Sequence, residues 1–267
     1  MRLISIWIGA VVALIFGVSA DAHEFWLVPH EAEAKTGDAV VFELRIGPNW
    51  PGVQTARLPH LVASFEAHDA VGTMSVEGRD GTLAVGHLRT RAAGATLVAL
   101  RTNPARLELS GAEFNQYLQE EGLNEVLALR QRHGLLDTPG RESFSRCAKS
   151  IILVDQNSRG YGRVVGLPLE LVPLTDPLGF IVSGNGGKFA VQLIFNGQPL
   201  AGALVKAQLK ADPPVELSAV SDQNGKVFFA LPRKGLWLFN AVHMLPAQDS
   251  SVDWESLWAS LTLSVPR

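Results

Sequence analysis

Cysteine is nearly absent from this chain, since Cys147 stands alone among 267 residues. A single thiol cannot close an intrachain disulfide, so we expect no disulfide partner and a fold stabilised by packing. Basic charge is also scarce. Lys and Arg number 23 against 26 Asp and Glu, and no block of basic residues occurs. The electrostatic footprint of a nucleic-acid-binding protein is therefore missing, and we predict no nucleic-acid partner.

Recognisable enzyme motifs are missing too. None of the seven histidines has the H-x-x-x-H or H-E-x-x-H spacing that is typical of zinc enzymes. No serine has a histidine and an acid at the spacing of a hydrolase motif. The glycine-rich stretch 184–187 is not followed by the helix pattern that a phosphate-binding loop requires. The sequence favours a role other than catalysis without excluding an enzyme.

One long apolar run is present, from Leu3 to Val18, and the small residues Ala20 and Ala22 follow it. This order is typical of a secretory signal peptide with an A-x-A cleavage site. We predict a signal peptide over 1–22, cleavage between Ala22 and His23, and a periplasmic or secreted protein. The run is shorter than the roughly 18 residues that span a bilayer, although it would act as a tether if it stayed uncleaved.

Period-two hydrophobic alternation indicates strands in the rest of the chain. Residues 40–46 alternate strictly. Further short strands are expected near 61–66, 72–76, 82–87 and 95–101, and in the C-terminal part at 189–195, 203–209, 215–221, 227–231, 236–243 and 261–265. Asn196-Gly197 and Asn224-Gly225 lie between alternating runs, which is a strong hairpin signal. We predict a mostly β fold built from two antiparallel β-sandwich domains.

The proline- and glycine-containing segment 173–179 is the best domain boundary. It divides the chain into an N-terminal sandwich-like domain over 23–174 and a C-terminal sandwich over 175–267. We expect a helical insertion at about 111–147 in the first domain. Ser110 and Glu113 have the spacing of a capping box at its start.

A second, shorter helix is predicted to begin at Thr138-Pro139, because proline suits the first turn of a helix. It would carry Glu142 and Arg146. We interpret the charged residues of the first helical stretch as its solvent-exposed side. These residues are Glu120, Glu121, Arg130 and Arg132.

Cleavage before His23 would create a distinctive metal ligand, because a terminal histidine offers an α-amine and an imidazole from one residue. We expect His243 to add a second imidazole. A carboxylate from Glu24, Asp253 or Glu255 would complete the site. Amine and imidazole nitrogen suit divalent nickel, cobalt and copper, with affinity generally highest for copper.

Three other interpretations remain open. In the first, the terminus is solvated and binds no metal, and His243 is satisfied inside the sandwich. Two histidines, one of them terminal, also resemble the copper brace of oxidative polysaccharide enzymes. A metal-free module that binds protein or carbohydrate through Trp26, Trp50 and Trp254 is the third.

Several segments together resemble a known family. They are 23–27, 114–118 with 120–123, 140–146, 166–170, 199–205, and 237–244 with 253–256. With them the chain resembles bacterial periplasmic domains of unknown function associated with nickel and cobalt uptake, including additional substrate-specific components of cobalt/nickel transporters. The C-terminal part resembles a transthyretin-like, carboxypeptidase-regulatory type of sandwich. The resemblance implies metal binding outside the cytoplasm and delivery to a membrane transporter component.

Overall fold

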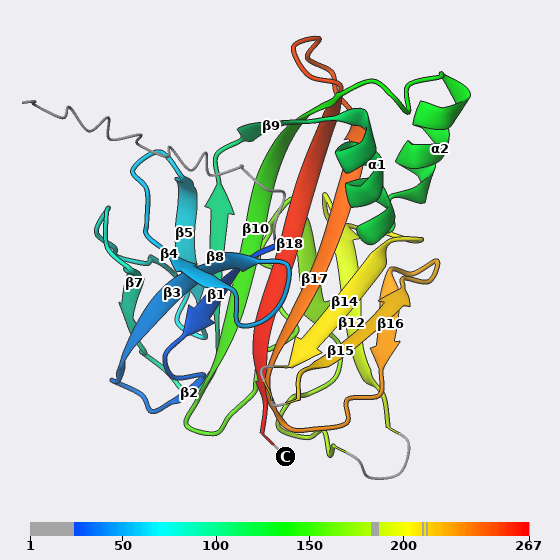
Figure 1. The fold of residues 1–267 in the computed structure, drawn as a ribbon. Coiled ribbons are helices and arrows are strands. Elements are labelled where there is room, and N and C mark those ends of the chain that lie inside the picture. Colours follow the sequence, from blue (N-terminus) through cyan, green and yellow to red (C-terminus); the bar gives the residue numbers. More distant parts are fainter. Residues whose placement is uncertain (1–23, 183–186, 210, 212, 267) are drawn as a thin grey trace, which may run out of the picture.

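The structure is a computed structural model that describes residues 24–182, 187–209, 211 and 213–266. Strands make up 51% of it and helices 8%, so the predicted mostly β, sandwich-like fold class is confirmed. Three sheets form the body of the molecule, and two helices lie together near one end of its longest strands (Figure 1). None of the described helices has the length and apolarity needed to cross a membrane.

The largest sheet has ten strands. Its main path runs β15 (Val215–Val220), β14 (Leu204–Leu209), β17 (Gly235–Pro246), β18 (Trp254–Val265), β10 (Gly140–Val154), β8 (Gly94–Thr102), β5 (Val62–His68) and β6 (Thr73–Ser75), while β2 (Glu33–Ala34) and β9 (Ala105–Leu109) also pair with β10. Most neighbours are antiparallel, as predicted. Strands β10 and β18 instead run parallel, with Glu142 opposite Trp254. Parallel neighbours require a long connection, and here nearly the whole second half of the chain supplies it.

The parallel pair joins the two predicted domains, since β10 lies within 23–174 and β18 within 175–267. The predicted boundary at 173–179 also falls between two strands, β11 and β12, that pair directly in another sheet. Both halves of the chain therefore contribute to the same sheets. The division into two domains stays a prediction.

Two smaller sheets cover opposite faces of the large one. The first contains β1 (Glu24–Pro29), β3 (Ala39–Gly47), β4 (Val53–Thr55) and β7 (Ala84–Arg89); the second contains β11 (Leu169–Pro173), β12 (Phe189–Phe195), β13 (Gln198–Pro199) and β16 (Lys226–Phe229). Strand β10 packs on both sides because its side chains alternate. Ile152 lies in the apolar cluster with Phe42 of the first small sheet, and Ile151 in the cluster with Phe189 of the second.

The helices are α1 (Gly111–Glu120) and α2 (Asn124–Arg132). The predicted capping box is present, since the Ser110 hydroxyl accepts from the backbone of Glu113 and the Glu113 carboxylate accepts from the backbone of Ser110. The predicted second helix is wrong. Residues 140–154 form β10, which buries side chains on both faces. Complete burial removes the alternation that marks a half-buried strand, so the local proline signal misled the prediction.

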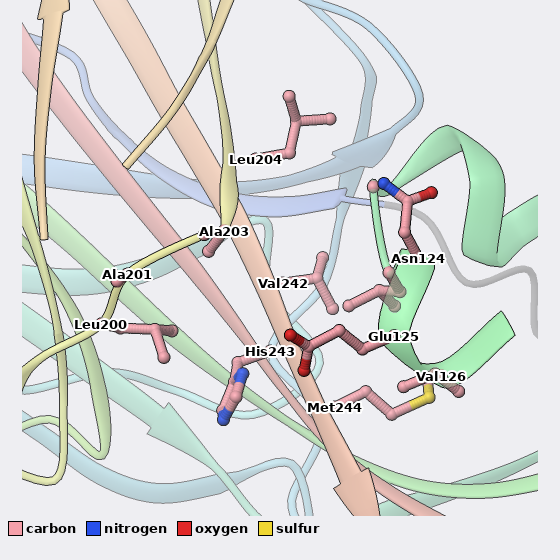
Figure 2. A pocket seen from close by; sticks show the side chains of 13 residues that line it. Asn124, Glu125, Val126, Leu200, Ala201, Ala203, Leu204, Val242, His243 and Met244 are labelled. Atoms are coloured by element: carbon pink, nitrogen blue, oxygen red, sulfur yellow. The ribbon is translucent and has the colours of Figure 1, made fainter. Parts of the chain in front are cut away.

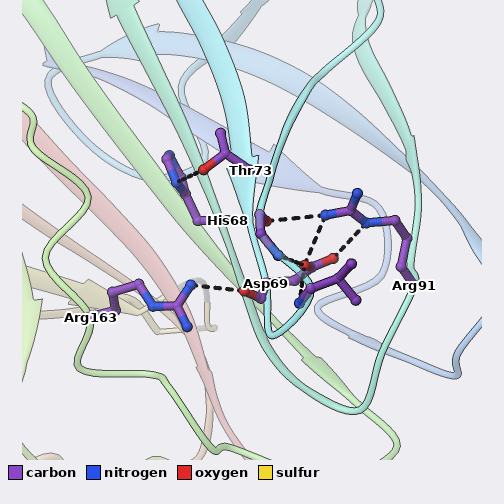
Figure 3. A network of polar contacts seen from close by, with 7 residues as sticks. His68, Asp69, Thr73, Arg91 and Arg163 are labelled. Atoms are coloured by element: carbon purple, nitrogen blue, oxygen red, sulfur yellow. Dashed lines mark hydrogen bonds and ion pairs between the residues drawn. The ribbon is translucent and has the colours of Figure 1, made fainter.

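A buried carboxylate fixes the turn between β5 and β6. Asp69 is only 2% exposed and accepts hydrogen bonds from Arg91 Nε and Nη2 at 2.9 Å each (Figure 3). Its Oδ1 also accepts from the backbone of Val71 and Gly72. From the other side, Arg163 donates to the Asp69 carbonyl at 2.8 Å. Every oxygen of Asp69 is thus used in holding loops, which indicates a structural role.

Candidate functional site

Of the five predicted metal ligands, His23 lies outside the described residues, and the next residue, Glu24, begins β1. The Glu24 carboxyl group is buried, with 3% exposed. Lys206 lies between two carboxylates, with its Nζ 3.4 Å from Glu24 Oε1 and 2.8 Å from Glu121 Oε1. Among the described residues, Glu24 Oε2 has no hydrogen-bond partner.

Negative charge accumulates around Glu24. Burial raises its pKa to about 7; Lys206 opposes this shift, while Glu121 and Glu216 add to it. A neighbouring pocket with a volume of about 390 Å³ is lined by Lys206 and Glu216 and also by Glu120. The carboxyl groups of Glu24, Glu121 and Glu216 therefore lie near a single lysine, so acidic groups outnumber basic ones here.

His243 lies on β17 and lines a different, smaller pocket of about 130 Å³ (Figure 2). Its ring makes an edge contact with Phe195, with ring centroids 4.6 Å apart. Burial lowers the pKa of His243, and the Glu125 carboxylate beside it opposes the shift. The imidazole is therefore held towards its neutral form, which is the form that can bind a metal.

Asp253 and Glu255 are placed at the start of β18. Arg141 binds Asp253 with both a backbone and a side-chain donor, at 3.0 Å from its nitrogen to Oδ2 and 2.7 Å from Nη2 to Oδ1. Hydrogen bonding from Arg141 lowers the pKa of Asp253. Glu255 is exposed and lies two residues before Leu257, which pairs with His243.

Glu24 and its partner Lys206 lie on one face of the large sheet, and His243 and Glu255 lie on the opposite face. His243 follows Phe239 and Ala241 at period two, and those residues face the second small sheet. Lys206, the partner of Glu24, pairs with Asn240, which alternates with them and faces β1. Glu24 and His243 are therefore not brought together. The described part of the chain contains no group of three or more His, Cys, Asp or Glu that could hold a metal ion.

A buried polar network beneath α1 escaped the sequence analysis. Glu142 is 0% exposed and accepts hydrogen bonds from the Ser256 hydroxyl and, at 3.3 Å, from the Tyr117 hydroxyl. Trp258 donates to Ser256 and stacks on Tyr117, with centroids 5.6 Å apart. Burial raises the pKa of Glu142 to about 7. Assignment of 138–146 to a helix hid this network, because only strand pairing places Glu142 beside β18.

The raised pKa of Glu142 predicts that the stability of the protein depends on pH. Its folded-state pKa of about 7 exceeds the ordinary value of 4.5, so its contribution is fully present below pH 4.5 and is lost as the pH rises through 7. We expect the free energy of unfolding to fall over this window. Glu142→Gln should weaken that fall by on the order of 3 kcal/mol.

Urea denaturation from pH 4.5 to 8 tests this expectation. Glu255→Gln, which changes an exposed carboxylate on the adjacent strand, serves as the control and should leave the pH profile unchanged. Buried Glu24 contributes with the same sign, so some dependence should persist in Glu142→Gln. Identical profiles for wild type and Glu142→Gln would contradict the assignment.

The tryptophans proposed for a carbohydrate-binding module are not available on the surface. Trp26 is 0% exposed, Trp254 is 5% and Trp50 is 9%. Trp26 stacks on Trp50, with ring centroids 5.8 Å apart. The three side chains pack in the interior, so they do not form the exposed binding surface that this alternative interpretation requires.

Residues 20–245 match a family model described as "Domain of unknown function (DUF4198)". No curated protein matches the chain significantly. Among solved structures, the chain is similar to the "D0-D1 domain of Intimin" at 12% identity, over 89% of this chain and 97% of that one, with a TM-score of 0.23. It is also similar to "Escherichia coli alpha-2-macroglobulin activated by porcine elastase" at 11% identity, over 91% and 22% of the two chains, with a TM-score of 0.22. Scores this low establish neither a common fold nor a common function.

The family match spans most of the sequence and agrees with the expected domain of unknown function. Nothing in the family's description links it to nickel or cobalt uptake, so that association stays a prediction. The chain belongs to the DUF4198 family.

Proposed function

We propose that this protein is exported, cleaved between Ala22 and His23, and binds a divalent transition metal at the new N-terminus for delivery to an uptake system. Nickel, cobalt and copper are the candidate ions, because amine and imidazole nitrogen suit all three. A membrane transporter component would be the recipient. The location of the protein would be the periplasm or the extracellular space.

The environment of Glu24 supports this proposal most strongly. Glu24 directly follows His23 in the sequence, its carboxyl group is buried, and its Oε2 has no hydrogen-bond partner in the described part of the chain. A buried unpartnered carboxylate oxygen costs free energy. A metal bound beside Glu24 would use that oxygen. It would also offset the surplus of negative charge from Glu121 and Glu216.

The proposal keeps two of the five predicted ligands at the centre of the site. His23 supplies the amine and imidazole, and Glu24 supplies a carboxylate. Asp253 is held by Arg141, and His243 and Glu255 lie on the opposite face of the sheet from Lys206. We assign those three residues no part in the proposed site.

Calorimetric titration of the protein beginning at His23 with copper(II), nickel(II) and cobalt(II) tests the proposal. We expect binding of at least one ion. One extra glycine before His23 converts the His23 amine to an amide and moves the free amine one residue away from the imidazole, and Glu24→Gln removes the carboxylate. Each change should weaken binding by on the order of tenfold or more.

Glu255→Gln and His243→Gln are matched controls that should leave the affinity unchanged. Equal binding by the extended chain would rule out the terminal amine as a ligand. Failure of all three ions to bind would remove the proposed function. If copper binds and the protein oxidises a glycan in the presence of peroxide, the oxidative enzyme replaces metal delivery as the function.

A further inference from the structure

A fully buried lysine–glutamate pair joins β10 to β11, away from the site proposed above. Lys149 Nζ and Glu170 Oε1 are 2.7 Å apart, and both side chains are 0% exposed. Lys149 shares a face of β10 with Cys147 and Ile151, which are both buried. Glu170 is flanked by the core residues Leu169 and Leu171. The amine and the carboxyl group are thus held in contact without solvent.

The Glu170 carboxyl group lies in a cradle of backbone donors. Its Oε2 accepts from the nitrogens of Gly166 at 3.0 Å, Val165 at 3.2 Å and Leu167 at 3.2 Å. The Val165 nitrogen also lies 2.9 Å from Oε1. These amides hold the carboxyl group in one orientation. They also face the oxygen on which negative charge develops when a nucleophile adds to the carboxyl carbon.

The Lys149 amine has few partners. An ammonium group carries three donors, yet Glu170 is the only hydrogen-bond acceptor of Nζ among the described residues. Burial lowers the pKa of Lys149, opposed by Glu170. Transfer of one proton from Nζ to Oε1 across the 2.7 Å contact leaves an uncharged amine beside an uncharged acid. An uncharged lysine amine is a nucleophile.

We propose that Lys149 and Glu170 condense to an intramolecular isopeptide bond. Lys149 Nζ forms a bond to Glu170 Cδ, and Oε2 carries the negative charge of the intermediate in the backbone cradle. Oε1, already protonated, takes one further proton from Nζ and leaves as water when its bond to Cδ breaks. One amide and one water replace one amine and one acid, so no oxidant or other reactant is required.

The bond would cross-link two strands whose linked residues are 21 positions apart. Closing a loop of this kind restricts the unfolded chain, as a disulfide does. A chain with the single cysteine Cys147 has no disulfide available for that purpose. The cross-link would also tie β10 of the large sheet to β11 of a smaller sheet.

Intact mass under denaturing conditions, followed by tryptic fragmentation, tests the proposal. We expect the wild-type mass to be lower than that of the processed sequence by one water, and a branched peptide to contain Lys149 joined to Glu170. Lys149→Arg should restore the full mass. Lys206 and Glu121, 2.8 Å apart but partly exposed, provide an internal control and should give no branched peptide.

A wild-type protein with the full sequence mass and unbranched peptides over 149 and 170 would overturn the proposal. This result is decisive whether or not the Lys149→Arg variant folds, because it depends on wild type alone. A branched peptide at Lys206 would also overturn it. That result would show that an isopeptide bond forms wherever a lysine and a glutamate are in contact, without burial. The outcome is independent of metal binding.

Discussion

Phe239→Ala is expected to lower the free energy of unfolding by about 3–5 kcal/mol. Phe239 is 0% exposed on β17 and lies at the centre of an aromatic group. Its ring centroid is 5.8 Å from that of Phe189, 5.7 Å from Phe229 and 6.4 Å from Trp237. These partners come from both sheets that enclose the larger core. Truncation would leave a cavity that rigid strands on both sides cannot fill.

Phe228→Ala is the matched control, because the same side chain is removed one residue from Phe229 on β16, at a position that is 48% exposed. We expect this variant to lose less than about 1 kcal/mol, as exposed positions usually do. Guanidinium denaturation followed by tryptophan fluorescence measures both variants. Similar losses for the two would mean that the sheets do not enclose Phe239 as described.

Half-buried strands were predictable because one of their faces is exposed to solvent. Along β3, Val40, Phe42 and Leu44 are buried and alternate with less buried residues, so the sequence carries the period of the strand. The C-terminal strands β12, β14 and β15 were likewise expected at nearly their observed positions. The predicted hairpin at Asn196-Gly197 is confirmed, because this turn joins the paired strands β12 and β13. The hairpin predicted at Asn224-Gly225 is wrong, because that turn connects β15 of the large sheet to β16 of a smaller one.

Strands covered on both faces were harder to predict. Strand β18 begins at Trp254, seven residues before its expected start at Leu261. Its first part mixes polar and apolar residues on one face, because Ser256 meets Glu142 beneath the helices. Partners brought from the far half of the chain satisfy these polar groups. No local pattern in the sequence records such a pairing, and the parallel contact between β10 and β18 was missed for the same reason.

The candidate site was predictable only in part. Adjacency in the sequence places Glu24 next to His23, and the structure adds that its carboxyl group is buried beside Lys206. The sequence could not indicate that His243 faces away from Lys206, since this depends on the register between β14 and β17. A one-residue change in register reverses every side chain on a strand. Ligands on different strands therefore cannot be assigned to one site until the pairing of those strands is known.

Arg130→Ala is expected to lower the free energy of unfolding by about 3 kcal/mol or more, since each hydrogen bond to a charged group contributes roughly 1.5–3 kcal/mol. The sequence placed Arg130 on the solvent side of a helix, but the side chain is 2% exposed. Its guanidinium donates to the carbonyls of Leu135 at 2.7 Å and Thr138 at 2.6 Å. It also lies 4.9 Å from the Phe114 ring centroid. One side chain thus holds the end of α2, the start of β10 and α1 together.

Arg132→Ala removes the same side chain two residues further along α2, at an exposed position, and should change stability by less than about 0.5 kcal/mol. Arg130→Lys keeps the charge but loses the planar fork of donors, so an intermediate loss is expected. Urea denaturation measures the global effect, and limited trypsin digestion reports on the segment between α2 and β10. Equal stability of the two alanine variants would show that Arg130 does not support the helices, because burial and its hydrogen bonds are all that distinguish it from Arg132.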